Sequence, residues 1–473
     1  MASANQTNVS SREKYLEFGG ELKKLFPQAE SWVNLNHGSY GTMPLEIREK
    51  FRAYQDLSEA APDKFIRYDQ GILLDESRQA VAELVNAPAD TVVFVTNATE
   101  AVNTVFRNMK WNDDGKDVII FFSTIYPACA KIADYMVDYF GTARVGIHEI
   151  ALHYPLEDEE IIQQFRDAVA EIEKQGKRAR ICTFDVVSSN PGLVFPWEEM
   201  CKACKQLGVL SMVDGAQGIG MVKLDLAAAD PDFFTSNCHK WLHVPRGCAI
   251  LYCPLRNQHL VPTTLATSHG YTPQTTVRRD VLPPNTKNQF VRTFELIATK
   301  DRSQEIVTKD AIAWRRDVCG GEERIMAYLW DLNKRGCRRV AEQLKTWMLE
   351  NKKGTLTNCA MGNIALPIRW QGETSAGGSG GGGGGGDGGS AQEGDVVVPE
   401  DDAAQVRTWM MKTMKDEYNT LMPLFAMGDR MWVRISAQIY LDMKDYDYGA
   451  KVLGELVARV AKGEYENLEQ NWL

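Results

Sequence analysis

One lysine lies in a setting that suits covalent chemistry. Lys240 sits in the segment SNCHKWL (236–242), directly after a short apolar run and before Trp241 and Leu242. Most lysines are solvated surface charges, and an isolated lysine fits that interpretation. In a partly desolvated loop at a strand end, however, its pKa falls and it can condense with a carbonyl group. The sequence therefore predicts Lys240 as a nucleophile.

Two further segments place polar groups at strand ends. Asp214, in MVDGAQGIG (212–220), ends an apolar run, so its carboxylate is expected above the sheet. It could bind ribose, a metal or a protonated ring nitrogen, or simply cap a turn. In TNATEAVN (96–103), Asn97 and Glu100 have the spacing of a capping box. A helix that opens there could bind a phosphate, although a plain N-cap explains the segment equally well.

The elements that must position these residues alternate along the chain. Short β-branched runs separated by helical stretches predict an α/β domain with a largely parallel, doubly covered sheet, whose ligand lies at the carboxyl ends of the strands. The predicted strands are 91–95, 118–122, 145–150, 180–187, 209–213, 233–236 and 248–253. An opening helix is expected at 15–30.

The chain divides into three parts by composition. We expect an N-terminal segment at 1–30, a large α/β domain at 31–303 and a smaller α+β domain at 304–473. A glycine-rich run at about 375–395 predicts a disordered insertion in the last part. Helical patterns are expected at 304–351, 402–416 and 445–462, with strands near 362–368 and 431–435.

The bulk composition limits the partners of the chain. Its 473 residues carry 53 basic and 63 acidic side chains, so the formal charge is 53 − 63 = −10. This balance argues against nucleic acid and anionic membranes, and no apolar run is long enough to span a bilayer. Cys201 and Cys204 have no second ligand pair, so no metal site is expected. Scattered cysteines favour a reduced, cytoplasmic protein.

Four motifs in a fixed order carry a family resemblance. TNATEAVN, DGAQGIG, SNCHKW and RISAQIY (434–440) resemble the class V aminotransferase superfamily, a branch of the fold type I enzymes that use pyridoxal 5′-phosphate (PLP). The resemblance runs from about residue 30 to the C-terminus, and NHGSYG (36–41) narrows it to the isopenicillin N epimerase-like subgroup. It implies a mostly parallel seven-stranded sheet covered by helices, with a smaller α+β C-terminal domain.

The resemblance also implies roles for single residues. Lys240 would hold PLP as a Schiff base and move the Cα proton of an amino-acid substrate, and Asp214 would pair with the ring nitrogen. The expected contacts of the other residues are Gln217 with the phenolic oxygen, Asn97, Ala98, Thr99 and His239 with the phosphate, Tyr126 with the ring and as a candidate acid, Arg434 with the substrate carboxylate, and Asn36 and His37 with the substrate.

Related enzymes are usually dimers with a shared active site. The loop at 265–271 and Thr299 match segments that reach the phosphate of the neighbouring subunit, although ordinary loop positions fit them too. Val186 stands where relatives often carry a histidine, and which of Ser188, Ser189 or Asn190 replaces it stays open.

The reaction type is expected from the same resemblance. The chain is similar to fungal carbon–sulfur lyases of ergothioneine biosynthesis, which cleave hercynylcysteine sulfoxide. Its last cysteine is Cys359, so no cysteine shortly before Arg434 could form the persulfide of a cysteine desulfurase. The alternatives are a PLP-dependent epimerase, aminotransferase or desulfurase-like enzyme acting on another amino acid, or a non-catalytic binding protein. A binding protein would not need Lys240 or Asp214, and both are present.

Overall fold

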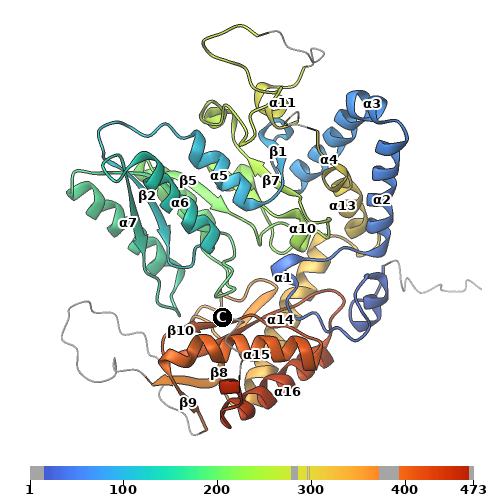
Figure 1. Ribbon diagram of the computed structural model, residues 1–473, viewed down its shortest axis with the longest axis vertical. Coiled ribbons are helices and arrows are strands. Elements are labelled where there is room, and N and C mark those ends of the chain that lie inside the picture. The colour runs from blue at the N-terminus through green and yellow to red at the C-terminus, as the bar shows by residue number, and fades with distance from the viewer. Residues whose placement is uncertain (1–14, 279–285, 296, 298, 372–393, 468–473) are drawn as a thin grey trace, which may run out of the picture.

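The computed structural model describes residues 15–278, 286–295, 297, 299–371 and 394–467. Of the predicted glycine-rich insertion, all but the last two residues lie outside these ranges. A large lobe is built on one sheet, and a smaller C-terminal lobe is built on a second sheet (Figure 1).

The large lobe contains a seven-stranded sheet, as predicted. Its order is β1-β7-β6-β5-β4-β2-β3, and all neighbouring pairs are parallel except those that β7 makes with β1 and β6. The strands are β1 (Val92–Val95), β2 (Asp117–Phe122), β3 (Val145–Ile150), β4 (Arg178–Asp185), β5 (Leu210–Asp214), β6 (Phe233–Ser236) and β7 (Ala249–Tyr252).

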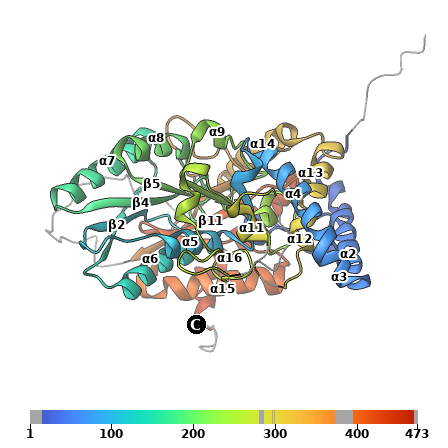
Figure 2. The same cartoon turned by 90° about the horizontal axis from the view of Figure 1, so that it is seen from above.

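Both faces of this sheet are buried, which explains its continuous apolar strands. Successive side chains of a strand point to opposite faces, so Phe233 packs into one core and Phe234 into the other. One face is covered by α5 (Ala98–Asn108), α6 (Pro127–Phe140) and α11 (Gln289–Glu295), and the other by α4 (Gln70–Leu84), α7 (Asp158–Lys174), α8 (Trp197–Leu207) and α9 (Leu226–Ala229) (Figure 2).

The smaller lobe packs helices against a four-stranded sheet of order β10-β11-β8-β9. Its strands are β8 (Met361–Gln371), β9 (Val396–Pro399), β10 (Leu424–Met427) and β11 (Arg430–Ser436), and its helices are α14 (Glu322–Leu344), α15 (Ala403–Tyr418) and α16 (Met443–Val460). The segment 304–351, predicted as one long helix or a broken pair, forms α12 (Ser303–Ile306), α13 (Thr308–Asp317) and α14. Gly320 and Gly321 lie between the last two at φ values of 85° and 91°.

The N-terminal part differs from the prediction at one place. No α-helix forms at 15–30; the described residues there contain only a 3₁₀ turn, Gly20–Leu25. Gly19 precedes it at a φ of 126°, and the backbone extends at Phe26, so the helical path is interrupted at both ends. The next helices are α1 (His37–Tyr40), α2 (Leu45–Ala60) and α3 (Pro62–Lys64), and α10 (Cys238–Trp241) follows β6.

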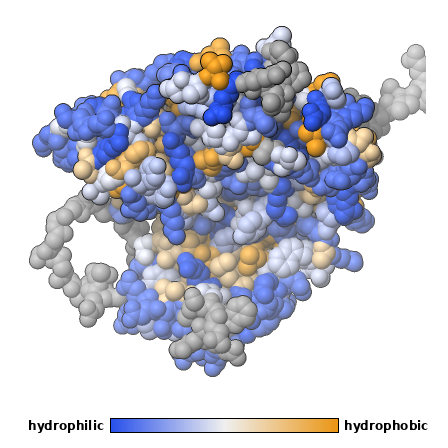
Figure 3. Space-filling model, turned by 45° about the horizontal axis from the view of Figure 1, so that its top comes forward, coloured by the Kyte–Doolittle hydropathy of each residue, from blue (hydrophilic) through white to orange (hydrophobic). Residues whose placement is uncertain are grey.

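The face shown in Figure 3 is mostly hydrophilic, with apolar atoms in scattered patches. Within the described residues, no helix has both the length and the hydropathy that a bilayer crossing requires.

Candidate active site

The predicted residues from both lobes converge at the carboxyl ends of the parallel strands. Lys240, on α10, interacts electrostatically with Asp214 at the end of β5 and with Arg434 on β11. Asp185, at the end of β4, and Cys129, on α6, act on the same amine. Two lobes and five segments of the chain therefore define one site.

The amine of Lys240 has no partner within the described part of the chain. It forms neither a hydrogen bond nor a salt bridge there. Burial lowers the pKa of the amine to about 8, although the negative charge of Asp214 acts to raise it. The main-chain carbonyl of Lys240, by contrast, is held by Nε2 of His37 at 2.7 Å. A fixed backbone thus carries a free amine with raised nucleophilicity at neutral pH.

Helix α1 packs tightly against the lysine loop. A side chain at Gly41, which has a φ of 64°, would place its Cβ 1.9 Å from the carbonyl oxygen of His239, so only glycine fits. The other ring nitrogen of His37 lies 2.9 Å from the hydroxyl of Tyr440. Both ring nitrogens of His37 are therefore engaged within the protein, and its contact with the substrate stays a prediction.

Asp214 is held by donors on both carboxylate oxygens. The amide of Ala216 donates to Oδ1 at 2.9 Å, and the thiol of Cys129 donates to Oδ2 at 3.5 Å. Burial raises the pKa of Asp214, while the Ala216 hydrogen bond acts in the opposite direction. The carboxylate is oriented for a cationic partner, as its predicted role requires.

Asp185 was not predicted from the sequence. It pairs with Asp214 in the parallel register of β4 and β5, and the residue is 7% exposed. The signal was available, because Asp185 ends an apolar strand just as Asp214 does. The next residue, Val186, stands where relatives often carry a histidine, and it is fully buried in the core.

The first turn of α5 shows how a phosphate could be received. The side chain of Asn97 caps the helix by accepting from the amide of Glu100 at 2.8 Å, and the Glu100 carboxylate accepts from the amide of Thr96 at 2.7 Å. The amide of Ala98 already donates to Asn237 Oδ1 at 2.9 Å. The amide of Thr99 has no partner among the described residues, so this backbone donor in the first turn of α5 is available to a phosphate.

Two more predicted cofactor contacts are partly occupied within the protein. Gln217 donates to the carbonyl of Gly38 at 2.8 Å and accepts from the indole of Trp241 at 2.7 Å, which leaves one amide hydrogen for a ligand. His239 Nδ1 lies 2.9 Å from the carbonyl of Cys248, so that nitrogen carries the hydrogen. Burial lowers the pKa of His239 to about 4.

Arg434 is a buried guanidinium without a carboxylate partner in the described residues. Its nitrogens donate to the carbonyl of Ser189 at 2.7 Å, to Asn36 Oδ1 at 2.8 Å and to Ser39 Oγ at 3.0 Å, and its Nε has no partner there. Burial lowers its pKa to about 10. A buried unpaired cation favours an anionic ligand.

The remaining predicted positions are more exposed. Tyr126 occupies the N-cap of α6, with 47% of its surface accessible, and Thr299 lies exposed in the loop after α11. Ser188 Oγ is bonded to the carbonyl of Pro191 at 2.6 Å, whereas Ser189 contacts Arg434. In the parts of the chain that the structure covers, no cluster of acidic, histidine and cysteine side chains is arranged to hold a metal.

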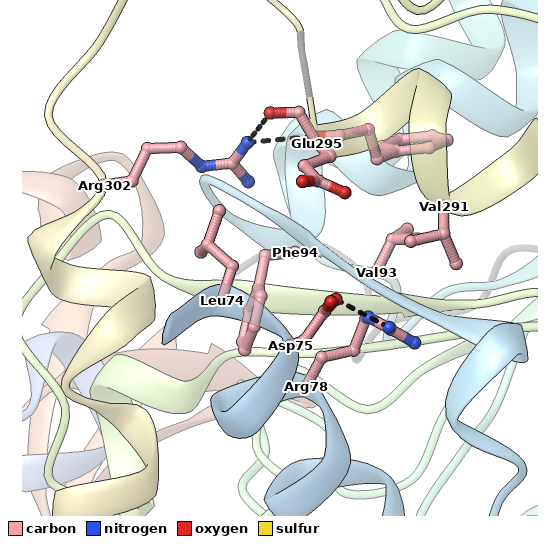
Figure 4. Close-up of a pocket in the computed structure, with 9 residues that line it drawn as sticks. Leu74, Asp75, Arg78, Val93, Phe94, Val291, Glu295 and Arg302 are labelled. Atoms are coloured by element: carbon pink, nitrogen blue, oxygen red, sulfur yellow. Dashed lines mark hydrogen bonds and ion pairs between the residues drawn. The ribbon is translucent and has the colours of Figure 1, made fainter. Parts of the chain in front are cut away.

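A small cavity between α4, β1 and α11 lies apart from the residues around Lys240, and its charged groups have partners within the protein (Figure 4). It measures about 20 Å³, room for a single water, and Arg78 pairs with Asp75 at 2.8 Å beside it. Arg302 donates to the carbonyl of Phe294 at 3.1 Å. Its charged groups are paired internally, so it offers no second reaction site.

Comparison with known proteins identifies the family. Residues 66–275 match the family model "Aminotransferase class-V". A relative from Epichloe uncinata, named L-cysteine desulfhydrase-like protein lolT1, is 31% identical over 96% of this chain and 99% of its own. The chain belongs to the class-V aminotransferase family. The predicted membership is thereby confirmed.

Other class-V aminotransferase relatives support the subgroup and the fold. Hercynylcysteine sulfoxide lyase of Schizosaccharomyces pombe is 28% identical over 92% of this chain and 97% of its own, and isopenicillin N epimerase of Streptomyces clavuligerus is 27% identical over 62% and 71%. The solved structure of the cystine C-S lyase C-DES with cysteine persulfide has a TM-score of 0.67 at 17% identity, covering 90% of this chain and 98% of that one. The predicted fold type I architecture is confirmed.

The class-V site fits pyridoxal phosphate, which is the cofactor of this enzyme, and the chain is a PLP-dependent carbon–sulfur lyase. The structural test is a set of three groups: the free amine of Lys240, the oriented carboxylate of Asp214, and the amide of Thr99, which has no partner in the described part of the chain and lies at a helix N-terminus. They match an aldehyde, a ring nitrogen and a phosphate.

The lowered pKa of Lys240 predicts how cofactor binding depends on pH. Only the neutral amine attacks an aldehyde, so the rate of PLP capture by cofactor-free protein should rise about tenfold from pH 6 to 7 and level off above about 8. Stopped-flow absorbance measures this rate. Free lysine, whose pKa is about 10.4, is the control: a rate for the protein that keeps rising to pH 10 contradicts a lowered pKa.

Proposed function

We propose that this enzyme cleaves hercynylcysteine sulfoxide, a cysteine conjugate oxidised at sulfur, by β-elimination. The products are a sulfenic acid and aminoacrylate, and aminoacrylate takes up water to give pyruvate and ammonia. A separate reductant then converts the sulfenic acid to ergothioneine. The relative that carries this activity in its name, from Schizosaccharomyces pombe, spans nearly the whole chain and supports the proposal.

One observation carries the reaction type: the site joins a free amine to an unpaired buried guanidinium but contains no accessible thiol. All ten cysteines of the chain are buried. A desulfurase that transfers sulfur through its own cysteine needs a thiol that can reach the substrate. Sulfur must therefore leave here as part of the substrate's own leaving group.

The side chains divide the steps of the reaction among them. Arg434, whose hydrogen-bond partners in the described residues are all neutral, binds the α-carboxylate and so orients the Cα–H bond. PLP, when bound, stabilises negative charge at Cα. Lys240 takes the Cα proton, because its lowered pKa makes the amine a base near neutral pH. Tyr126, exposed at the N-cap of α6, donates a proton to the departing sulfur.

The decisive experiment measures product from matched substrates. Purified enzyme with PLP is incubated with hercynylcysteine sulfoxide, S-methylcysteine sulfoxide and cysteine, and pyruvate is followed with lactate dehydrogenase. We expect kcat/KM to be highest for the hercynyl conjugate. Recovery of a racemised substrate, or of a keto acid with the side chain intact, would instead identify an epimerase or an aminotransferase. A protein that binds substrates without changing them is a binding protein.

The role of Tyr126 predicts a leaving-group effect. Tyr126→Phe should lower kcat about 100-fold for a thiolate leaving group that needs a proton. The loss should be only a few-fold for a conjugate of a nitrothiophenol, which leaves without protonation. Tyr135→Phe, at another exposed tyrosine of α6, is the matched control and should retain full activity. Equal losses with both substrates would remove Tyr126 from the role of acid.

We further infer that the enzyme works as a homodimer in the cytoplasm. The exposed side chains of Leu265, Tyr271 and Val277, on the segment that precedes Thr299, support a subunit contact there. Light scattering of the holoenzyme measures its mass, and a monomer at micromolar concentration contradicts this inference.

A further inference from the structure

Two carboxyl groups end neighbouring strands beside Lys240. Asp185 and Asp214, which we call the acid pair, are register partners in the parallel strands β4 and β5. Side chains two residues apart on a strand share a face. Ile181 and Met212 lie in the core under α5 and α6, so both acids emerge on that same face.

The two acids differ in their hydrogen-bond partners. Asp214 accepts from the amide of Ala216 and the thiol of Cys129. The carboxyl of Asp185 makes no hydrogen bond with any described residue, and the residue as a whole is only 7% exposed. A buried carboxyl without a partner costs free energy that a ligand or a retained proton must offset.

The charges around Asp185 come from four elements. Asp214 faces it from β5, Lys240 from α10 and Cys129 from α6. Tyr154, in the loop after β3, also faces it and has a buried hydroxyl without a partner. One ammonium group therefore faces two carboxyls, and two buried like charges at close range do not both ionise.

The donors decide which acid keeps the proton. Hydrogen bonds to a carboxylate favour its charged form, and only Asp214 receives them. Consistent with this, burial and then the charge of Asp214 raise the pKa of Asp185 well above its usual range. A carboxylic acid kept neutral at pH 7 by an apolar site is a known hydrogen-bond donor in enzymes.

We propose that Asp185 is the protonated member of the acid pair and a positioning residue that donates a hydrogen bond to the bound cofactor, leaving Asp214 as the single charge for the ring nitrogen. The role rests on PLP binding and on no particular substrate. Its tests therefore succeed or fail independently of the proposed cleavage of hercynylcysteine sulfoxide.

The first test detects the proton itself. Holoenzyme with ¹³C-labelled aspartate carboxyls should show at pH 7 the infrared carbonyl band of a protonated acid, and the band should be lost in Asp185→Asn. A wild-type spectrum without this band would overturn the proposal, and that result does not depend on the folding of any variant.

The second test compares two substitutions whose side chains, like that of aspartate, have four heavy atoms and branch at Cγ. Asparagine mimics a neutral acid that can donate, so Asp185→Asn should keep the PLP dissociation constant within threefold and the pKa of the Lys240 Schiff base, read from its visible absorbance, nearly unchanged. Asp185→Leu removes the donor and should weaken PLP binding about tenfold, the size of one hydrogen bond.

Each contrary result has a distinct meaning. If Asp185 were ionised in the wild type, Asp185→Asn would remove a negative charge that stabilises the protonated Schiff base, and its pKa would fall by a unit or more. If Asp185→Leu bound PLP as tightly as the wild type, no hydrogen bond would be donated. Either outcome rejects the proposal.

Discussion

Replacing Lys240 with alanine is expected to lower the rate of pyruvate formation by at least about 10⁴-fold and to abolish the visible absorbance of the Schiff base between the cofactor and the protein. The amine is both the covalent anchor of PLP and the base for the Cα proton, so the substitution removes two functions together. The change leaves the fold intact, because the side chain has no partner among the described residues and the backbone stays held by His37.

The control separates covalent chemistry from charge. Lys223→Ala removes an exposed lysine outside the site and should leave the absorbance and the rate unchanged. Added methylamine should partly restore turnover in the Lys240→Ala protein by acting as a diffusible base. A Lys240→Ala protein that, in amine-free buffer, still carries PLP covalently attached after borohydride reduction would show that another residue holds the cofactor.

Replacing Arg434 with glutamine is expected to lower kcat/KM for amino-acid substrates by about 100-fold, as the loss of a charged, bidentate contact predicts. The structure supports this size because the guanidinium is buried and has only neutral partners there, the carbonyl of Ser189 and the side chains of Asn36 and Ser39. Steady-state pyruvate formation measures the effect.

A ligand without the carboxylate provides the matched comparison. Cysteamine lacks the α-carboxylate of cysteine but keeps its amine and thiol. Its binding to the holoenzyme, read from the shift in visible absorbance, should be equally strong in wild-type and Arg434→Gln protein, whereas the binding of cysteine should weaken. A loss of the same size for both ligands would assign Arg434 a structural role.

The sequence predicted the scaffold better than the contacts within it. The seven strands followed from their apolar runs, because burial on both faces leaves a clear signal. The opening helix at 15–30 was wrong, since a backbone path set by Gly19 and Phe26 overrides the local pattern. The predicted N-cap at Asn97 is present, because its side chain accepts from the amide of Glu100. The Glu100 carboxylate, however, accepts from the amide of Thr96, one residue before the cap, and not from the amide of Asn97 as in a capping box.

Contacts between distant segments could not be predicted. Nothing in the segment 96–103 indicates that Asn237 takes the amide of Ala98, and the pairing of His37 with the carbonyl of Lys240 spans 203 residues. Nothing in the local sequence around Cys129 indicates that its thiol contacts Asp214. Such contacts depend on how the lobes meet, which local patterns do not encode.

The hydrogen bonds that hold the Lys240 loop have a consequence for synthesis of the protein. The carbonyl of Lys240 is held by His37, His37 is bonded to Tyr440, and Arg434 reaches the same place from β11. Segments on both sides of Lys240 thus complete this centre, one of them 203 residues before the lysine. A growing polypeptide on the ribosome cannot close the centre until Tyr440 has emerged, so the lysine loop waits for residues that are translated well after it.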